Sequence, residues 1–152
     1  FEIPKNKKQF DDNFVLFLED IRDPGNLGTI IRSAEWFGLN EIYCSETCAD
    51  AYNTKVIQAS MGSSSRIQVN YLNFEDLLKQ KANFTPVLAD MNGTALKDYK
   101  WKAKNILVIG NEANGVSNEL RNKIENKITI PRHGKAESLN ASISAAIILS
   151  HI

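Results

Sequence analysis

The chain has 152 residues, of which 43% are hydrophobic and 24% are charged. This length suits one domain with a substantial core, and the balance is that of an ordinary globular protein. The formal net charge is zero, so the chain has no overall basic field for binding nucleic acid. No apolar run approaches the ~18 residues needed to cross a bilayer, and we expect a cytoplasmic protein with no membrane partner.

Strand-like apolar runs alternate with helix-like runs along the whole chain. In chain order we predict a strand at 14–20, a helix at 29–38, a strand at 41–45, a helix at 51–62, a strand at 66–72, a helix at 74–82, strands at 85–90 and 105–111, a helix at 116–124, a strand at 127–131 and a helix at 138–152. Asn73 and Ser117 are expected helix caps. The alternation predicts an α/β fold, with a mostly parallel sheet and helices on both faces.

The two cysteines and the amino terminus bear on domain organisation. Cys44 and Cys48 have no second pair and no nearby histidine, so we expect ordinary thiols and no metal site. The chain begins at Phe1 without a signal-peptide pattern. We expect residues 1–13 to be a lead-in, the end of a linker from a preceding domain, and residues 14–152 to form one domain.

The first segment with chemical potential is DPGNLGTIIRSAEWFG, at 23–38. Its proline and glycines, with Gly28 among them, are expected to shape a tight strand-to-helix connection, and N–H groups at a helix start can face an anion. Arg32 lies about one turn into the predicted helix, away from its apolar face. The guanidinium is expected either to face a phosphate or reacting hydroxyl, or to pair on the surface with Glu35 or Glu41.

The second segment is LVIGNEANGVSNEL, at 107–120. A buried strand is predicted to end at Gly110, where the missing Cβ lets backbone approach a ligand. Glu112 follows, and is expected either to accept hydrogen bonds at a site or to be a solvated turn residue. The glycine spacing matches neither a Walker A loop nor a G-x-G-x-x-G fingerprint.

The third segment is IPRHGKAESLNASISAAIILSHI, which closes the chain. Ser138 is expected to cap a final helix that is apolar on nearly every side. Asn140 then falls inside the first turn, where asparagine is a poor helix former. A polar amide beside free backbone N–H groups indicates a site at this point.

Together the three segments resemble the three motifs of the SpoU/TrmH family of RNA 2′-O-ribose methyltransferases, in the SPOUT superfamily. The first motif is matched at Asn26, Gly28, Ile30, Arg32 and Ala34, the second at Gly110, Glu112 and Gly115, and the third at Ile130, Pro131, Gly134, Ser138, Leu139, Asn140 and Ser142. The segment ASMGSSSRIQV also resembles one that lies between the first two motifs, including Arg66. The similarity covers residues 14 to 152.

The resemblance implies a SPOUT-type fold in which the last helix is threaded through a loop, forming a deep C-terminal trefoil knot. It also implies a homodimer with the knot region at its interface. A buried carboxyl-terminal helix with a polar start is then expected.

The implied activity moves a methyl group from S-adenosylmethionine to a ribose 2′-hydroxyl of transfer or ribosomal RNA, leaving S-adenosylhomocysteine and using no metal. The implied catalytic residues are Arg32, Asn26, Glu112, Ser138 and Asn140. The implied cofactor-binding residues are Ala89, Asp90, Gly110, Asn111, Glu112, Ile130, Ser138 and Leu139. The implied RNA-binding residues are Arg22, Arg32, Arg66, Arg132 and Lys135.

Two alternatives stay open. Arg32 is either the acceptor of the hydroxyl proton or a binder of phosphate and developing oxyanion charge, because an arginine with a pKa above ~12 is a poor base. The alternative functions are a non-catalytic RNA-binding or assembly module with the same fold, and an unrelated α/β nucleotide-binding domain.

Basic residues cluster in two places despite the zero net charge. The clusters are Lys5, Lys7 and Lys8, and Lys97, Lys100, Lys102 and Lys104. Taken alone, each cluster is interpreted as a solvated face.

Overall fold

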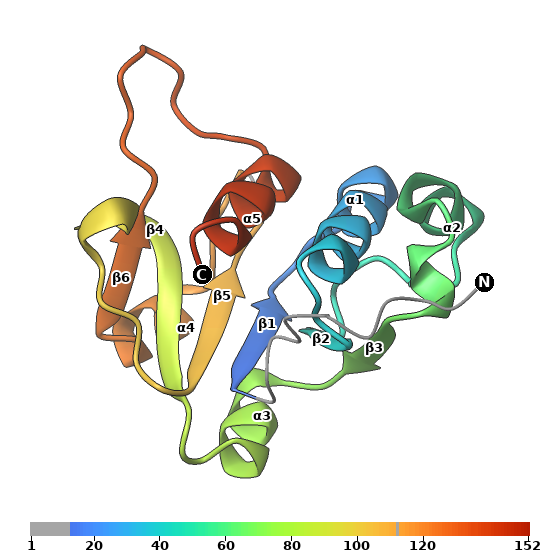
Figure 1. The fold of residues 1–152 in the computed structure, drawn as a ribbon, viewed down its shortest axis with the longest axis horizontal. Helices are drawn as coiled ribbons and strands as arrows, with labels where there is room; N and C mark the ends of the chain where they lie inside the picture. Colours follow the sequence, from blue (N-terminus) through green and yellow to red (C-terminus); the bar gives the residue numbers. More distant parts are fainter. Residues whose placement is uncertain (1–12, 112) are drawn as a thin grey trace, which may run out of the picture.

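The computed structural model describes residues 13–111 and 113–152, which form a sheet between two layers of helices (Figure 1). The strands are β1 (Phe14–Leu18), β2 (Glu41–Cys44), β3 (Gln68–Tyr71), β4 (Thr85–Ala95), β5 (Asn105–Ile109) and β6 (Asn126–Thr129). The helices are α1 (Pro24–Trp36), α2 (Thr54–Ser60), α3 (Phe74–Gln80), α4 (Asn118–Lys123) and α5 (Ala141–Leu149), with short 3-10 turns η1 (Ser63–Ser65) and η2 (Leu96–Asp98).

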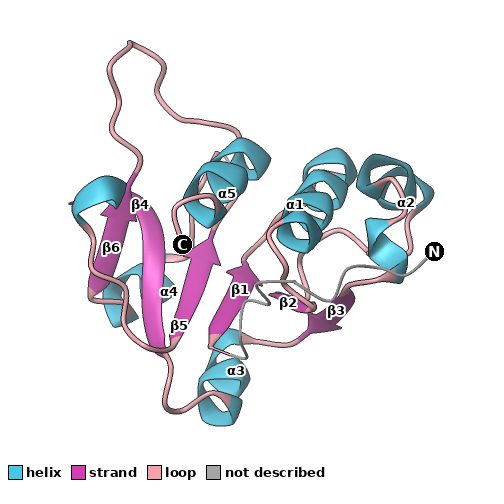
Figure 2. Cartoon of the chain, in the orientation of Figure 1, coloured by secondary structure: helices cyan, strands magenta, loops and turns pink. Residues whose placement is uncertain are grey.

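The sheet has the strand order β3-β2-β1-β5-β4-β6, and every strand pair in it is parallel (Figure 2). The chain moves outward from β1 to β3, crosses to β4, returns to β5 and ends at β6. The predicted α/β class and parallel sheet are confirmed.

Helices cover both faces, as predicted. One face of the sheet packs against α1, α2 and α5, and the other packs against α3 and α4. Neighbouring residues of β1 divide between them: Leu16 belongs to the first apolar cluster and Phe17 to the second. Burial of each such side chain contributes about 1.5–3 kcal/mol. Because both faces are covered, the strand sequence FVLFL is apolar throughout rather than alternating.

Helix α1 begins at Pro24 rather than in the predicted region from Thr29. The carboxylate of Asp23 caps the helix by accepting a 2.7 Å hydrogen bond from the N–H of Asn26. Pro24 occupies the first turn, where its missing N–H leaves no donor unpaired. The predicted loop residues of the first motif therefore lie in the first helical turns.

Gly28 has a different role from the one predicted. It is buried where α1 packs on α2, and a Cβ at this position would lie 2.6 Å from the carbonyl oxygen of Val56 and 2.6 Å from the Cβ of Ala59. The prediction that it shapes the connection is wrong. Its lack of a side chain allows the two helices to approach closely.

Helix α5 begins after Asn140, not at Ser138. The side-chain oxygen of Asn140 accepts hydrogen bonds from the N–H groups of Ser142 (2.8 Å) and Ile143 (3.4 Å), so Asn140 is the N-cap. The prediction that Ser138 caps the helix is wrong, because Ser138 lies in the preceding loop. Asn140 is therefore a favourable residue at a helix start and not a poor one inside it.

Strand β4 continues past its predicted end at residue 90. Ala89 and Thr94 both lie opposite Ile128 of β6, so the residues between them form a β-bulge. A Cβ on Gly93 would lie 2.5 Å from the backbone of Ile128, which makes glycine necessary there. The bulge follows directly on Ala89 and Asp90, two of the predicted cofactor residues.

Other expectations have mixed outcomes. Asn73 and Ser117 cap α3 and α4, as predicted. No helix in the described part of the chain is long and apolar enough to cross a membrane. The predicted lead-in lies outside the described residues except for Asn13, and the trefoil knot stays a prediction.

Candidate functional site

The predicted site residues gather at one edge of the sheet. In a parallel sheet all strand carboxyl ends lie at the same edge, where the loops after β1, β4, β5 and β6 leave. β1 and β5 are neighbouring strands, but the chain leaves them toward opposite faces of the sheet. The connection after β1 leads to α1 on one face, and the connection after β5 leads to α4 on the other. Ligands of open parallel sheets bind at such switch points.

The structure joins the first and third motifs through two amides. Nδ2 of Asn140 donates a 2.9 Å hydrogen bond to Oδ1 of Asn26, across 114 positions of sequence. Since α1 and α5 also pack against each other, this bond fixes the two helix starts side by side. These two predicted catalytic residues are therefore brought together.

The amide of Asn140 is almost fully occupied by the protein. Its oxygen accepts from the N–H and hydroxyl of Ser142 and from the N–H of Ile143, while its nitrogen donates to Asn26. An amide nitrogen has two donors, so one further donor remains. Asn140 mainly orders the two helix starts, with a single N–H left for a ligand.

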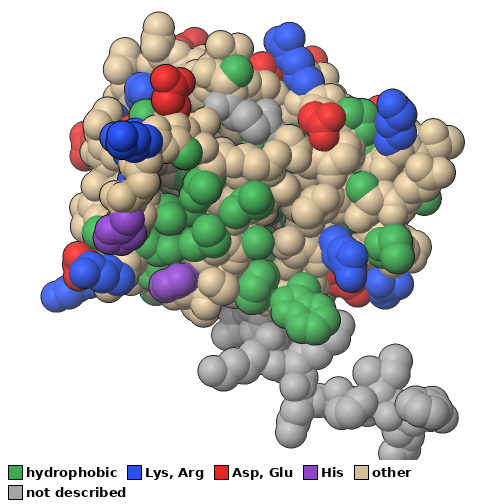
Figure 3. Space-filling view, turned by 90° about the horizontal axis from the view of Figure 1, so that it is seen from above, with side chains coloured by type: hydrophobic (Ala, Val, Ile, Leu, Met, Phe, Trp, Pro, Cys, Tyr) green, Lys and Arg blue, Asp and Glu red, His purple; other side chains and the backbone are tan. Residues whose placement is uncertain are grey.

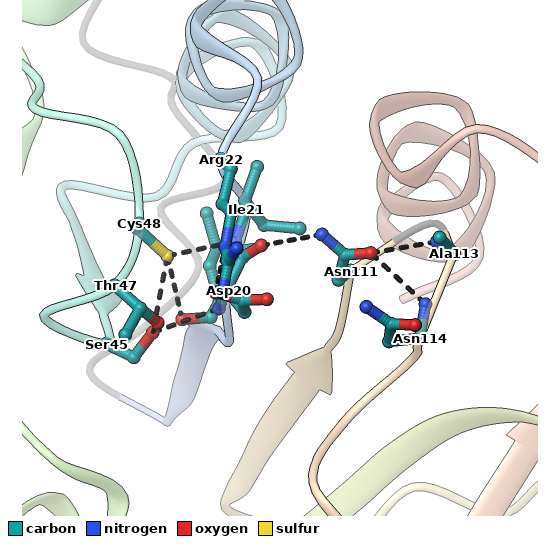
Figure 4. A network of polar contacts seen from close by, with 10 residues as sticks. Asp20, Ile21, Arg22, Ser45, Thr47, Cys48, Asn111, Ala113 and Asn114 are labelled. Carbon is teal, nitrogen blue, oxygen red and sulfur yellow. Dashed lines mark hydrogen bonds and ion pairs between the residues drawn. The ribbon is translucent and has the colours of Figure 1, made fainter.

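The loops after β1 and β5 are tied together by Asn111 (Figure 4). Its Nδ2 donates to the carbonyl oxygen of Asp20 (3.0 Å), and its Oδ1 accepts from the N–H groups of Ala113 (2.9 Å) and Asn114 (3.2 Å). Its own N–H and carbonyl form a reciprocal pair with Gly115. Asn111 was predicted to bind the cofactor, but these contacts leave its side chain little capacity to do so and make it a support of the loop.

Asp20 is the residue on which these contacts converge. Its φ of 59° is in the left-handed region, which is unfavourable for a residue other than glycine. The hydroxyl of Ser45 accepts a 3.0 Å hydrogen bond from the N–H of Asp20, and Nε of Arg22 donates to the carboxylate (2.7 Å). With Asn111 on the carbonyl, the conformation is held from three directions (Figure 4).

Cys48 supports the loop that follows β1. Its sulfur accepts from the N–H of Ile21 (3.3 Å) and donates to the carbonyl of Leu18 (3.4 Å). The thiol of Cys44 lowers the pKa of Cys48 to about 7, with help from Ser45 and the backbone and against the effect of burial. Both thiols are free and buried.

Asp90, a predicted cofactor residue, is paired inside the protein. Its carboxylate lies 3.4 Å from Nη1 of Arg121, and it also accepts a hydrogen bond from the N–H of Asn92 (3.0 Å). Only 5% of the Asp90 side chain is exposed. Nε of Arg121 is buried without a hydrogen-bond partner in the described part of the chain, so a donor next to this bulge remains available.

The remaining predicted cofactor residues offer backbone and apolar surface. Ala89 is the last residue of β4 before the bulge, Gly110 directly follows β5, and Ile130 is half-buried after β6. Ser138 and Leu139 lie in the exposed loop that rises away from the sheet (Figure 1), and Leu139 is 44% exposed. Small residues and exposed apolar side chains suit a flat, uncharged ring system. The missing Cβ of Gly110 was expected to admit a ligand, but it admits the backbone of Gly115, whose carbonyl carbon would lie 2.4 Å from a Cβ there.

Arg32 lies in the middle of α1 with its side chain exposed. Glu35 pairs with Arg66 and Glu41 with Lys81, so neither acid supplies the surface pairing considered from the sequence. Arg32 makes no ion pair with any residue in 13–111 or 113–152. Glu112, its predicted partner, lies outside the described residues.

The other predicted RNA-binding cations have separate surroundings. Arg66 binds both carboxylate oxygens of Glu35, Arg22 pairs as described above, and Arg132 donates to a carbonyl in its own loop (3.3 Å). Lys135 is exposed in the same loop. All of these side chains reach solvent, and their contacts with RNA stay a prediction.

Sequence reasoning missed the residues that hold the loops. Asp23 caps α1, and a capping residue followed by proline is a start signal that could have been recognised. Glu19 accepts hydrogen bonds from the N–H (2.8 Å) and hydroxyl (3.0 Å) of Ser117 at the start of α4. That contact spans 98 positions, and no local pattern indicates it.

Substitutions of Asn111 can separate its contact with Asp20 from its contacts with the N–H groups of Ala113 and Asn114. Asn111→Ala removes all three side-chain hydrogen bonds and is expected to lower the free energy of unfolding by about 2–3 kcal/mol. Asn111→Asp keeps the oxygen that binds the two N–H groups but loses the donor to Asp20, so a loss of about 1–2 kcal/mol is expected. Urea denaturation measures both. Asn114→Ala is the matched control, because it retains the backbone N–H that binds Asn111. Equal stability of all three variants would contradict the role of Asn111 in joining the loops after β1 and β5.

The described residues contain no cluster of three histidine, cysteine or carboxylate side chains suited to a metal ion.

Residues 13–150 match the model of a family described as the SpoU rRNA Methylase family. The chain is 35% identical over 141 residues to the 23S rRNA (guanosine(2553)-2′-O)-methyltransferase RlmP of Bacillus subtilis, covering 91% of this chain and 57% of that protein. It is 32% identical over 152 residues to an uncharacterized tRNA/rRNA methyltransferase of Archaeoglobus fulgidus, covering 98% of this chain and 68% of that protein.

Solved structures show the same similarity. A putative RNA methyltransferase of the TrmH family from Porphyromonas gingivalis superposes with a TM-score of 0.84 at 34% identity, over 97% of this chain and 62% of that one. An AdoMet-bound rRNA methyltransferase from Sinorhizobium meliloti superposes with a TM-score of 0.84 at 31% identity, over 91% of this chain and 55% of that one. The chain thus spans little more than half the length of several of these proteins.

Proposed function

Because the chain belongs to the SpoU rRNA methylase family, we propose that it methylates a ribose 2′-hydroxyl of RNA with S-adenosylmethionine as the methyl donor. The observation that carries the proposal is the hydrogen bond between Asn26 and Asn140. It brings the first and third motifs together at the carboxyl edge of the sheet, beside an exposed arginine.

The residues at this edge fit the adenosine part of the cofactor. Ala89, Gly110, Ile130 and Leu139 offer backbone and apolar surface for the adenine, and Arg121 has a buried unpaired donor among the described residues. Asp90 is held by Arg121 and would act through that pair rather than directly. When bound, the cofactor supplies an electrophilic methyl group on a sulfonium.

The chain's own residues have the remaining tasks of positioning oxygen and controlling charge. Arg32 binds the phosphate next to the reacting ribose and stabilises negative charge on the 2′-oxygen, since a guanidinium stays protonated near neutral pH. Asn26 and Asn140 hold the starts of α1 and α5 in place. Glu112 is proposed to orient Arg32, with Ser138 contributing from the loop before α5.

Ribosomal RNA is the substrate that we propose first. The relative from Bacillus subtilis is named for a guanosine of 23S rRNA, and the match covers most of this chain. Transfer RNA is the other substrate class implied by the motifs. We propose that the enzyme acts in the cytoplasm, where both classes of RNA function.

The test is methyl transfer from tritiated S-adenosylmethionine to in vitro transcribed 23S rRNA and to bulk transfer RNA. Ribose 2′-O-methylation makes the neighbouring phosphodiester resistant to alkaline hydrolysis, so product digestion identifies the modified atom. Label in alkali-resistant dinucleotides is the expected result. RNA binding without label, after calorimetry has established cofactor binding, would favour the non-catalytic module.

We also propose that two copies of the chain pair through the region of α1 and α5. Both helices expose large apolar side chains: Trp36 is 83% exposed and Ile143 is 51% exposed. The end of the molecule seen from above has hydrophobic side chains gathered in its middle (Figure 3). A second copy would cover them, and sedimentation velocity of the purified chain measures whether it does.

A further inference from the structure

Four lysines lie in one short segment that begins in η2 and ends directly before β5. We define the lysine row as Lys97, Lys100, Lys102 and Lys104. The segment at 97–104 contains only one acidic residue, Asp98, although the chain as a whole is neutral. The row is thus the most basic part of the described chain, and nothing in the site uses it.

The row differs in its electrostatic surroundings from the lysines that are paired with acids. Lys79, Lys81 and Lys123 each have a carboxylate oxygen within 3.2 Å. None of the four lysines of the row has an ion pair with a described residue. Four unpaired like charges close together repel one another, and that repulsion is relieved when a polyanion binds.

Aromatic packing holds the segment against the core. Tyr99 and Trp101 are partly buried against the core, with ring centroids 5.0 Å apart, and Trp101 packs edge-on against Phe14 at 5.6 Å. Between them Lys100 is exposed, and Lys102 follows on the same outward side. In an extended chain alternate residues are about 6.5–7 Å apart, close to the separation of neighbouring phosphates along one nucleic-acid strand.

Both ends of the segment are anchored. The buried side chain of Asn105 donates to the carbonyl of Lys102 (2.7 Å) and accepts from its N–H (3.1 Å). At the other end the N–H of Tyr99 donates to the carbonyl of Ala95 (3.1 Å). The backbone that carries the lysines is therefore anchored at both ends, so little backbone conformational entropy is lost when they bind a partner.

The row begins at the edge of the sheet that carries the candidate site. β4 ends there, and the segment returns along the sheet to the start of β5 at the opposite edge (Figure 1). Lys104, at the far end, has its Nζ 5.5 Å from the centroid of the Phe84 ring. A strand of RNA with its ribose in the site can therefore continue along this surface.

From these observations we propose that the lysine row is a docking surface for the phosphate backbone of the RNA substrate, outside the methyl-transfer site. The proposal rests on the proposed function for the identity of the polyanion. Contacts of this kind position an RNA and strengthen its binding without selecting its sequence.

The test compares Lys100→Gln/Lys102→Gln with Lys55→Gln/Lys79→Gln, which removes the same charge from exposed lysines elsewhere. The probe is a labelled transcript of Bacillus subtilis 23S rRNA, titrated with the full chain at several salt concentrations. The row variant is expected to bind at least tenfold more weakly. Its slope of log affinity against log salt should be smaller in magnitude by about 1.5, from two lost phosphate contacts. Thermal unfolding and cofactor binding should not change.

Equal losses in the row variant and the control would overturn the proposal, as would a transcript that the wild-type chain does not bind. The proposed function fails separately. A wild type that binds the transcript through the row but transfers no methyl group keeps the docking surface and removes the activity. If the row variant binds and methylates RNA as well as the wild type does, only the docking surface is overturned.

Discussion

Arg32→Ala is expected to reduce kcat for methyl transfer about 100- to 1,000-fold while leaving folding and cofactor affinity nearly unchanged. The magnitude is that of removing one preorganised group that stabilises charge in a transition state. Arg32 is exposed and has no acid partner among the described residues, so its removal leaves no buried charge unpaired. Single-turnover methylation with tritiated cofactor measures the rate, and calorimetry measures the affinity.

Further variants define the role of the guanidinium. Arg32→Lys keeps the positive charge but loses the planar fork of donors, so it should recover only part of the rate. Added guanidinium ion should partly restore Arg32→Ala if binding of phosphate or oxyanion is what matters. Lys55→Ala removes an exposed cation elsewhere and should have wild-type rates. Wild-type turnover in Arg32→Ala would remove Arg32 from the mechanism.

Gly28→Ala is expected to lower the free energy of unfolding by about 2–4 kcal/mol, although the added group is a single methyl. The new Cβ would lie 2.6 Å from the carbonyl oxygen of Val56 and from the Cβ of Ala59, and 3.1 Å from the backbone nitrogen of Ser60. Backbone atoms cannot move aside as a flexible side chain does, so α1 and α2 must separate. Urea denaturation followed by circular dichroism measures the loss.

Gly134→Ala is the matched control for that change. Gly134 also belongs to a predicted motif, but a Cβ there would have no atom within 4 Å. Its stability should be within about 0.5 kcal/mol of wild type. If Gly28→Ala were as stable as Gly134→Ala, the glycine of the first motif would have to be explained by ligand binding instead of helix packing.

The contrast between these glycines changes how the first motif is interpreted. Asn26, Gly28 and Arg32 fall on one helix, yet each has a separate purpose. Gly28 lets α2 approach, Asn26 accepts a hydrogen bond from the start of α5, and Arg32 is exposed on the helix surface. Two of these three motif residues therefore serve the fold, and only Arg32 is left for the proposed chemistry.

The class of fold and the order of its elements could be predicted from the sequence. Runs such as FVLFL are apolar at every position because both faces of the sheet are covered, and this pattern is visible in the sequence itself. Helix caps at Asn73 and Ser117 are also local, since a cap binds an N–H only a few residues away. The three motifs identified the family, and with it the residues most worth testing.

Only the tertiary structure decided which of those residues meet and which are already occupied. Asn26 and Asn140 are 114 positions apart, Asn111 and Asp20 are 91 apart, and their contacts depend on strand order rather than on any local pattern. Asp90 and Arg66 are paired within the protein for the same reason. Sequence periodicity reports the face on which a side chain lies, because burial is a local preference. It does not report the partner, because the partner is set by how distant strands align in the sheet.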